Sequence, residues 1–388
     1  MKASPPDTLQ LMREIVAVPS VSSVSPDIDM GNQGVINKLA GWLEDLGFHV
    51  EVLPLVANPD KANLIATLGK GQGGLVLAGH TDTVPFDESR WHYNPLDLTE
   101  ADGRLYGMGT CDMKGFFALA IAAARRYSAA ALQAPLVIVA TADEESTMNG
   151  ARELAASGRL QAGHVVIGEP TGLRPVRMHK GMMMEAIRLV GRSGHSSDPS
   201  LGVNAMEGMH RVLADVLAWR DELQQRYRDD AFAVASPTLN LGRIFGGDNP
   251  NRICAHCELH YDLRPLPGML PDSLRDEIGR RLTALTGGSG LELEMYTLME
   301  SVPPFESSPA SAIVAAAEEL TGTAAESAAY STEAPFFKQC GMDAVVLGPG
   351  DIAQAHQPDE FIALNRVEPT VDLLDGLIRR FCVQAGSS

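Results

Sequence analysis

The sequence has few cysteines, few basic residues and no long apolar segment, and each shortage excludes a class of protein. Its five cysteines are an odd, sparse set in 388 residues, which does not fit a disulfide framework. Lysine and arginine total 31 against 49 aspartate and glutamate residues, so the formal net charge is -18. A surface this acidic repels nucleic-acid phosphates and anionic lipid, and we expect neither as a partner.

No segment predicts a membrane span or a secretory signal. The longest apolar run, residues 116–124, is too short to cross a bilayer. Residues 1–20 lack an apolar signal core and have a helical pattern from Asp7 onward. We therefore expect a cytoplasmic protein without a membrane partner. Apolar residues make up 45% of the chain, enough for a large core, and the length suits two domains.

The first half of the chain alternates short apolar runs with helical patterns. Strands are predicted at residues 49–53, 64–67, 75–78, 136–140 and 165–167. Helices are predicted at 34–46, 115–127 and 151–156. Continuous apolar strands separated by helices predict an α/β fold, with a mainly parallel sheet and helices on both of its faces.

The pattern changes after about residue 178. Mixed polar and apolar strands are predicted at 185–190, 257–263 and 291–295, separated by helices at 205–226 and 271–284. A helix at 311–320 and an apolar strand at 344–347 then return to the first pattern. We therefore predict an α/β domain formed by residues 1–178 and 299–388. A smaller α+β domain, residues 179–298, interrupts it.

Acidic residues and histidines follow the predicted strands of the first domain. His80 comes after the strand at 75–78, Glu144 and Glu145 after 136–140, and Glu169 after 165–167. Asp112 precedes the helix at 115–127, and His356 lies beyond the strand at 344–347. Because binding sites of open parallel sheets form beyond the carboxyl ends of the strands, we expect these side chains to share one crevice.

That many carboxylates cannot share a crevice while ionised unless cations neutralise them. Two divalent metal ions would do so, and mixed imidazole and carboxylate ligands favour zinc, with cobalt or manganese as alternatives. No single residue carries this prediction. His80 alone would more often be a turn residue, Asp112 could cap the following helix, and Glu144 and Glu145 could form a solvated turn.

Five motifs, in their order and spacing, resemble the zinc aminoacylase and carboxypeptidase family over nearly the whole chain. They are residues 80–85 (HTDTVP), 109–115 (GTCDMKG), 143–145 (DEE), 168–170 (GEP) and 348–360 (GPGDIAQAHQPDE). That family includes acetylornithine deacetylases and succinyl-diaminopimelate desuccinylases. Residues 348–360 and 109–111 resemble the acetylornithine deacetylase branch most.

The resemblance implies a metal-binding catalytic domain with assigned ligands. His80 and Glu169 would hold one metal ion, Glu145 and His356 the other, and Asp112 would bridge them. The resemblance also implies a cis peptide after Asp112.

The resemblance also implies which side chains take part in catalysis and what role the inserted domain has. Asp82 would orient the imidazole of His80, and Glu144 would be the general base. His195 of the inserted domain would stabilise the oxyanion, although a turn histidine is the alternative. The inserted domain would act as a lid and join two chains in a homodimer.

The substrate implied is a small N-acyl amino acid. Arg264 resembles the family's carboxylate-binding arginine, and Asn251 is a further candidate. Thr332 and Glu333 would line the crevice, where Glu333 would pair with a side-chain ammonium group. Arg264 could instead be a surface arginine, and Glu333 an acid at a helix start.

The activity expected is deacetylation of N-acetyl-L-ornithine to ornithine and acetate, in arginine biosynthesis. The alternatives are a related N-acyl-amino-acid deacylase, a succinyl-diaminopimelate desuccinylase or a dipeptidase. A non-catalytic metal-binding relative is an alternative from a different class of protein.

Overall fold

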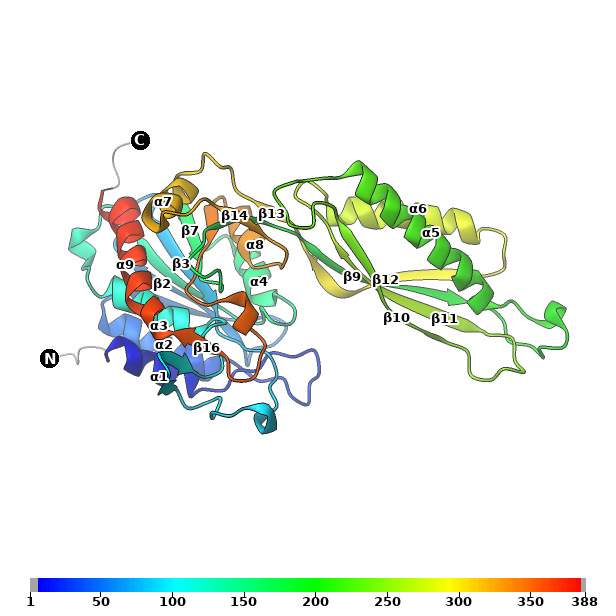
Figure 1. Cartoon of the computed structure of the whole chain (residues 1–388), viewed down its shortest axis with the longest axis horizontal. Coiled ribbons are helices and arrows are strands. Elements are labelled where there is room, and N and C mark those ends of the chain that lie inside the picture. The colour runs from blue at the N-terminus through cyan, green and yellow to red at the C-terminus, as the bar shows by residue number, and fades with distance from the viewer. Residues whose placement is uncertain (1–5, 385–388) are drawn as a thin grey trace. The chain divides into compact units, whose positions relative to one another are not determined.

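The computed structural model describes residues 6–384, which divide into two compact units (Figure 1). The first unit holds the chain up to Arg177, Ser307–Glu326 and the chain from Thr332 on. The second holds Met178–Glu306 and Ser327–Ser331. The predicted inserted segment, 179–298, thus falls within the second unit, which extends further because its last long strand continues to Val302. The use of this unit as a lid or for dimerisation stays a prediction.

Within the described residues, a nine-stranded sheet runs in the order β1-β2-β6-β3-β7-β15-β8-β13, and β14 pairs with β8. Its first strands are β1 His49–Pro54, β2 Ala62–Leu68, β3 Leu75–His80, β6 Leu136–Thr141 and β7 His164–Ile167. The others are β8 Val176–His179, β13 Phe305–Glu306, β14 Glu326–Ala328 and β15 Asp343–Val346.

The sheet is mixed, with a parallel group at its centre. Strands β6, β3, β7 and β15 run parallel, whereas β1, β2 and β8 run antiparallel to their neighbours. Residues 69–74, between β2 and β3, are too few for the crossover that parallel strands need, so β2 runs the opposite way. The predicted α/β class is confirmed, and its parallel strands are the ones followed by the acidic motifs.

Helices cover both faces of this sheet, as predicted. Five helices share one apolar core with alternate residues of the central strands: α1 Thr8–Val16, α2 Gln33–Asp45, α3 Lys114–Ala124, α7 Ala312–Thr321 and α9 Val367–Ile378. Helix α3 is apolar all round because it is buried on every side. Helices α4 Asn149–Ser157 and α8 Ala334–Gln339 contact each other over the opposite face (Figure 1).

The first unit also contains a three-stranded sheet, in which strands that are far apart in sequence pair with one another. Strand β5 (Arg104–Tyr106) pairs with β4 (Thr99–Ala101) on one side and with β16 (Phe361–Ala363) on the other. The segments after β5 and before β16 carry Asp112 and His356. Short 3-10 turns occupy Glu88–Arg90, Ala129–Ala131, Pro199–Leu201, Ile352–Gln354 and Leu364–Arg366, and a π turn occupies Arg379–Val383.

The second unit is a four-stranded antiparallel sheet with two helices on one face (Figure 1). Its strand order is β10-β11-β9-β12, from β9 Met182–Val190, β10 Thr238–Gly246, β11 His256–Arg264 and β12 Glu292–Val302. Helices α5 (Ala205–Arg226) and α6 (Pro271–Thr286) contact each other and pack on alternate strand residues such as Ile187 and Leu259. The predicted antiparallel strands and two helices are confirmed.

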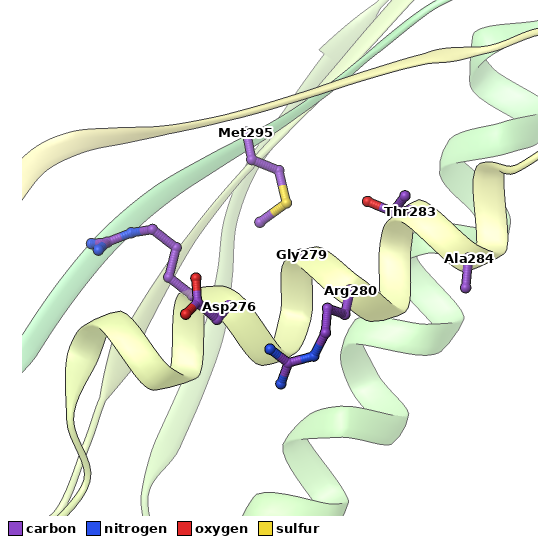
Figure 2. Close-up of a pocket in the computed structure, with 7 residues that line it drawn as sticks. Asp276, Gly279, Arg280, Thr283, Ala284 and Met295 are labelled. Carbon is purple, nitrogen blue, oxygen red and sulfur yellow. The ribbon is translucent and has the colours of Figure 1, made fainter.

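The second unit also has a hollow of about 580 Å³ between α6 and β12 (Figure 2). Its lining residues are Arg275, Asp276, Gly279, Arg280, Thr283, Ala284 and Met295. None of them is a predicted site residue, so this hollow is separate from the chemistry expected of the chain. Among the described residues, no helix combines the length and the apolar character needed to span a bilayer.

Candidate active site

The acidic motifs of the first unit meet at the carboxyl ends of its central strands. His80 ends β3, Glu144 and Glu145 follow β6, Glu169 follows β7, and Asp112 lies just before α3. Two overlapping groups each place their ligand atoms within 4.8 Å of one another: His80 with Glu144 and Glu169, and His80 with Asp112 and Glu145. Parallel strands therefore bring together residues that are distant in sequence.

Asp112 lies between two imidazoles. The Nε2 atom of His80 is 3.1 Å from Asp112 Oδ1, and Nε2 of His356 is 3.4 Å from Asp112 Oδ2. His356 Nε2 is also 3.0 Å from Glu145 Oε1. Each carboxylate oxygen of Asp112 thus faces a different histidine, as a bridging carboxylate requires. The peptide between Asp112 and Met113 is cis, which confirms that expectation.

The charges of this cluster are not balanced by the protein. Burial raises the pKa of Glu144, Glu145 and Glu169 above the ordinary value, and neighbouring carboxylates raise it further. Glu169 Oε1 is buried and has no hydrogen-bond partner among the described residues. A divalent cation would supply both the missing charge and the missing contact. The residues present therefore fit a pair of divalent metal ions.

At His80 and Asp112 the neighbouring charges favour the ionised form of the side chain and outweigh the effect of burial. Burial opposes a charge on His80, yet Asp112, Asp82 and Glu144 together raise its pKa well above the ordinary value. Burial also opposes ionisation of Asp112, but His356 and His80 lower its pKa. The carboxylates around His80 and Asp112 thus favour a positive charge at this position.

Asp82 makes its contact with His80 through the backbone. His80 Nδ1 is 3.0 Å from the carbonyl oxygen of Asp82, whereas the carboxylate oxygen Oδ1 is 3.7 Å away, too far for a hydrogen bond. The other oxygen, Oδ2, accepts a hydrogen bond from the backbone N–H of Glu145 at 3.0 Å. Asp82 therefore links His80 to the turn that carries Glu145, and its orienting role stays a prediction.

That turn is held by residues that sequence analysis missed. Asp143 has a left-handed backbone (φ 61°), which a non-glycine residue adopts only when its surroundings hold it. Its Oδ1 accepts a hydrogen bond from Ser22 Oγ at 2.8 Å and forms a buried ion pair with Lys61. Lys61 is only 4% exposed and also pairs with Asp29 at 2.6 Å. The sequence gives no signal for this pair, because 82 residues separate Lys61 from Asp143.

We expect Lys61→Met to lower the free energy of unfolding by about 3–5 kcal/mol, because it leaves the buried Asp143 and the partly buried Asp29 without their cation. Urea unfolding measures the change. Lys38→Met is the matched control: Lys38 pairs with Glu14 at 3.3 Å on the surface, and its loss should cost about 1 kcal/mol or less. Equal effects of the two substitutions would contradict a stabilising role for Lys61.

Glu333 and Thr332 lie at the start of α8 and are buried. Glu333 does not cap the helix with its side chain. Its Oε2 accepts a hydrogen bond from Thr141 Oγ1 at 2.9 Å, and Oε1 has no partner among the described residues. Burial raises the pKa of Glu333 to about 7. Thr332 Oγ1 accepts a hydrogen bond from the Ala334 N–H at 3.1 Å.

The remaining predicted residues belong to the second unit. His195 Nδ1 lies 2.7 Å from Ser197 Oγ in a loop, the contact expected of a turn histidine. The carbonyl oxygen of Asn251 accepts a hydrogen bond from Ser196 N–H at 3.1 Å in the same loop region. Arg264 donates from Nε to Asp262 Oδ1 at 2.8 Å. The functional roles of all three stay predictions.

Sequence comparison matches this chain to one family. The model of peptidase family M20/M25/M40 matches residues 76–380. The acetylornithine deacetylase of Pasteurella multocida (strain Pm70) is 48% identical over 377 residues, covering 97% of this chain and 98% of its own. That of Edwardsiella ictaluri (strain 93-146) is 49% identical over 382 residues, covering 98% of this chain and 100% of its own.

Solved structures show the same fold. An M20 family metallo-carboxypeptidase of Sulfolobus solfataricus has a TM-score of 0.74 at 19% identity, covering 97% of this chain and 99% of its own. A dinuclear metal-binding M20 peptidase of Bacillus subtilis has a TM-score of 0.68 at 15% identity, covering 96% of each chain. The resemblance stated from the motifs is thereby confirmed. The chain belongs to peptidase family M20/M25/M40 and is a metal-dependent hydrolase of amide bonds.

Proposed function

We propose that this chain removes the acetyl group of N-acetyl-L-ornithine, giving ornithine and acetate, as a step of arginine biosynthesis. The observation that carries the proposal is the similarity to acetylornithine deacetylases, 48% and 49% identity over nearly the full length of both chains. The clustered histidines and carboxylates of the first unit support metal-dependent amide hydrolysis, and the specificity rests on the similarity alone. We place the enzyme in the cytoplasm as a homodimer joined through the second unit.

The proposed metal ligands are the five side chains of the cluster other than the base. His80 and Glu169 would hold one ion and Glu145 and His356 the other, with Asp112 between them. Zinc suits this mixed ligand set, and cobalt or manganese are the alternatives. When bound, the two ions would polarise the amide carbonyl and lower the pKa of a nearby water molecule.

Glu144 is the proposed general base. It would accept a proton from the attacking water as the water oxygen bonds to the carbonyl carbon. As the carbon–nitrogen bond breaks, Glu144 would return that proton to the leaving amine. A base is most effective when its pKa lies near the working pH, and in the metal-free chain burial raises the pKa of Glu144 above its ordinary value. His195 would donate to the oxygen of the tetrahedral intermediate, from its own chain or its partner's.

The carboxylate of the substrate would be bound by a positively charged side chain, and its side-chain ammonium group by a negatively charged one. Asp262 accepts a hydrogen bond from Nε of Arg264, so the other N–H groups of the planar guanidinium would bind the substrate carboxylate. Asn251 is the second residue proposed to bind that carboxylate. Glu333 carries a carboxylate oxygen without a partner among the described residues, and an ornithine ammonium group would satisfy it. Thr332 adjoins Glu333 in sequence and would contact the same part of the substrate.

A substrate panel tests this proposal. Zinc-loaded protein should show its highest kcat/KM for N-acetyl-L-ornithine among that compound, N-succinyl-diaminopimelate and small dipeptides. N-acetyl-L-norvaline, which lacks only the side-chain ammonium group, is the matched control, and its kcat/KM should be lower. Glu333→Gln should reduce this preference for the ammonium group. A higher kcat/KM for another compound would replace the proposed substrate, and no hydrolysis of N-acetyl-L-ornithine would overturn the proposed activity.

A further inference from the structure

Glu360 joins the two segments that carry Asp112 and His356. Its carboxylate oxygen Oε1 accepts hydrogen bonds from the backbone N–H groups of Cys111, at 2.8 Å, and Asp112, at 3.0 Å. Its own carbonyl oxygen accepts a third from Gly107 N–H at 3.0 Å. Glu360 is 1% exposed, so these bonds form away from water. One buried residue therefore fixes the backbone of the proposed bridging ligand.

The segment before Glu360 needs such an anchor. His356 and Asp359 both have left-handed backbones, with φ of 59° and 56°, which non-glycine residues adopt only when their surroundings hold them. The His356 side chain is 53% exposed, so packing constrains it little. Glu360 is four residues further along the chain and is the nearest position in that segment bonded directly to the Asp112 backbone.

A purely structural role would also explain a buried acceptor such as Glu360, because each buried N–H group without a partner lowers the stability by about 1–3 kcal/mol. Two features of the Glu360 contacts indicate more than this structural role. The N–H groups belong to Asp112 itself and to its neighbour, and the acceptor belongs to the segment that presents His356. Together with the pairing of β5 and β16 and the Cys111 Sγ contact to the Asp351 carbonyl, the Glu360 side chain therefore helps to set the distance between Asp112 and His356.

We propose that Glu360 is a positioning residue that sets the affinity of the metal ion held by Glu145 and His356. It does so by holding the Asp112 backbone at a fixed distance from His356. The inference rests on the metal ligands given under the proposed function. His80 and Glu169 do not contact Glu360 among the described hydrogen bonds, so the ion they hold depends on it less.

Titration of metal-depleted protein with zinc chloride, followed by calorimetry, tests the proposal without substrate. The wild-type protein should bind two ions. Glu360→Ala should weaken one of them by about 10–100-fold and the other much less, as the loss of an outer contact to metal ligands typically does. Titration with cobalt, followed by visible absorption, should show the altered coordination of the same ion.

Glu360→Gln keeps a carbonyl oxygen for both N–H groups and should bind the ions nearly as the wild type does. Glu185→Ala is the control for the loss of a buried glutamate: Glu185 is 1% exposed in the second unit, pairs with Arg275, and should leave both affinities unchanged. If circular dichroism shows Glu360→Ala to be unfolded, Glu360→Asp, with a shorter reach, should weaken the same ion.

Unchanged affinities in Glu360→Ala, or equal weakening of both ions, would overturn the role of Glu360 and leave the proposed function standing. A wild-type protein that binds no metal would overturn the proposed ligand set, and with it the inference.

Discussion

Glu144→Ala should lower kcat for N-acetyl-L-ornithine by about 100-fold or more, because no other group would accept the proton of the attacking water. Metal content should stay at the wild-type level, since the proposed ligands remain. KM should change little. Steady-state kinetics and metal analysis of the same preparation measure all three quantities.

The free energy of unfolding of Glu144→Ala shows whether a low kcat results from the loss of the base or from an unfolded protein. Burial and the neighbouring carboxylates raise the pKa of Glu144, so its ionised form destabilises the folded chain at neutral pH. Removing it should therefore leave the free energy of unfolding equal to or above that of the wild type. Glu51→Ala, at a partly exposed acid of β1 that pairs with Arg159, serves as control and should keep wild-type kcat. Residual turnover above about a tenth of the wild-type value would exclude Glu144 as the base.

Removing the metal ions should abolish hydrolysis and lower stability, and the loss of stability should grow as the pH rises. In the protein alone, burial raises the pKa of Glu145 and Glu169, that of Glu333 to about 7 and that of Glu360 to about 8. A carboxyl group whose pKa is raised by folding contributes its stability in full below its unfolded value, near 4.5. That contribution is lost as the pH rises through the folded value.

Metal-free protein should therefore lose stability between about pH 5 and pH 8, by about 1.4 kcal/mol per pH unit for each such group. With metal bound, the carboxylates at the ions are already ionised and neutralised, so the slope should be smaller and stability at pH 8 higher. Urea unfolding at several pH values, with chelator or with zinc, measures the difference. The same slope in both series, or activity that survives the chelator, would contradict a metal-dependent site.

Local sequence patterns predicted the central strands and helices, because apolar residues recur at the spacing that buries them in a strand or a helix. The apolar run of β3 predicted a buried strand, and the polar residues after it predicted the position of His80. The clustering of His80, Glu145 and Glu169 also followed from the sequence, since parallel strands end at one edge of the sheet. The place of β2 in the sheet did not follow, because β6, which comes later in the chain, pairs between β2 and β3.

The sequence by itself determined which side chains would gather at the edge of the sheet, because spacing after a strand fixes where a residue emerges. Tertiary structure alone decided what holds them in place. Lys61 reaches Asp143, and Glu360 reaches Asp112 across 248 residues, through contacts that have no period and no local motif. Such pairs exist only after the chain has folded, when burial removes water and makes each remaining polar group depend on one specific partner.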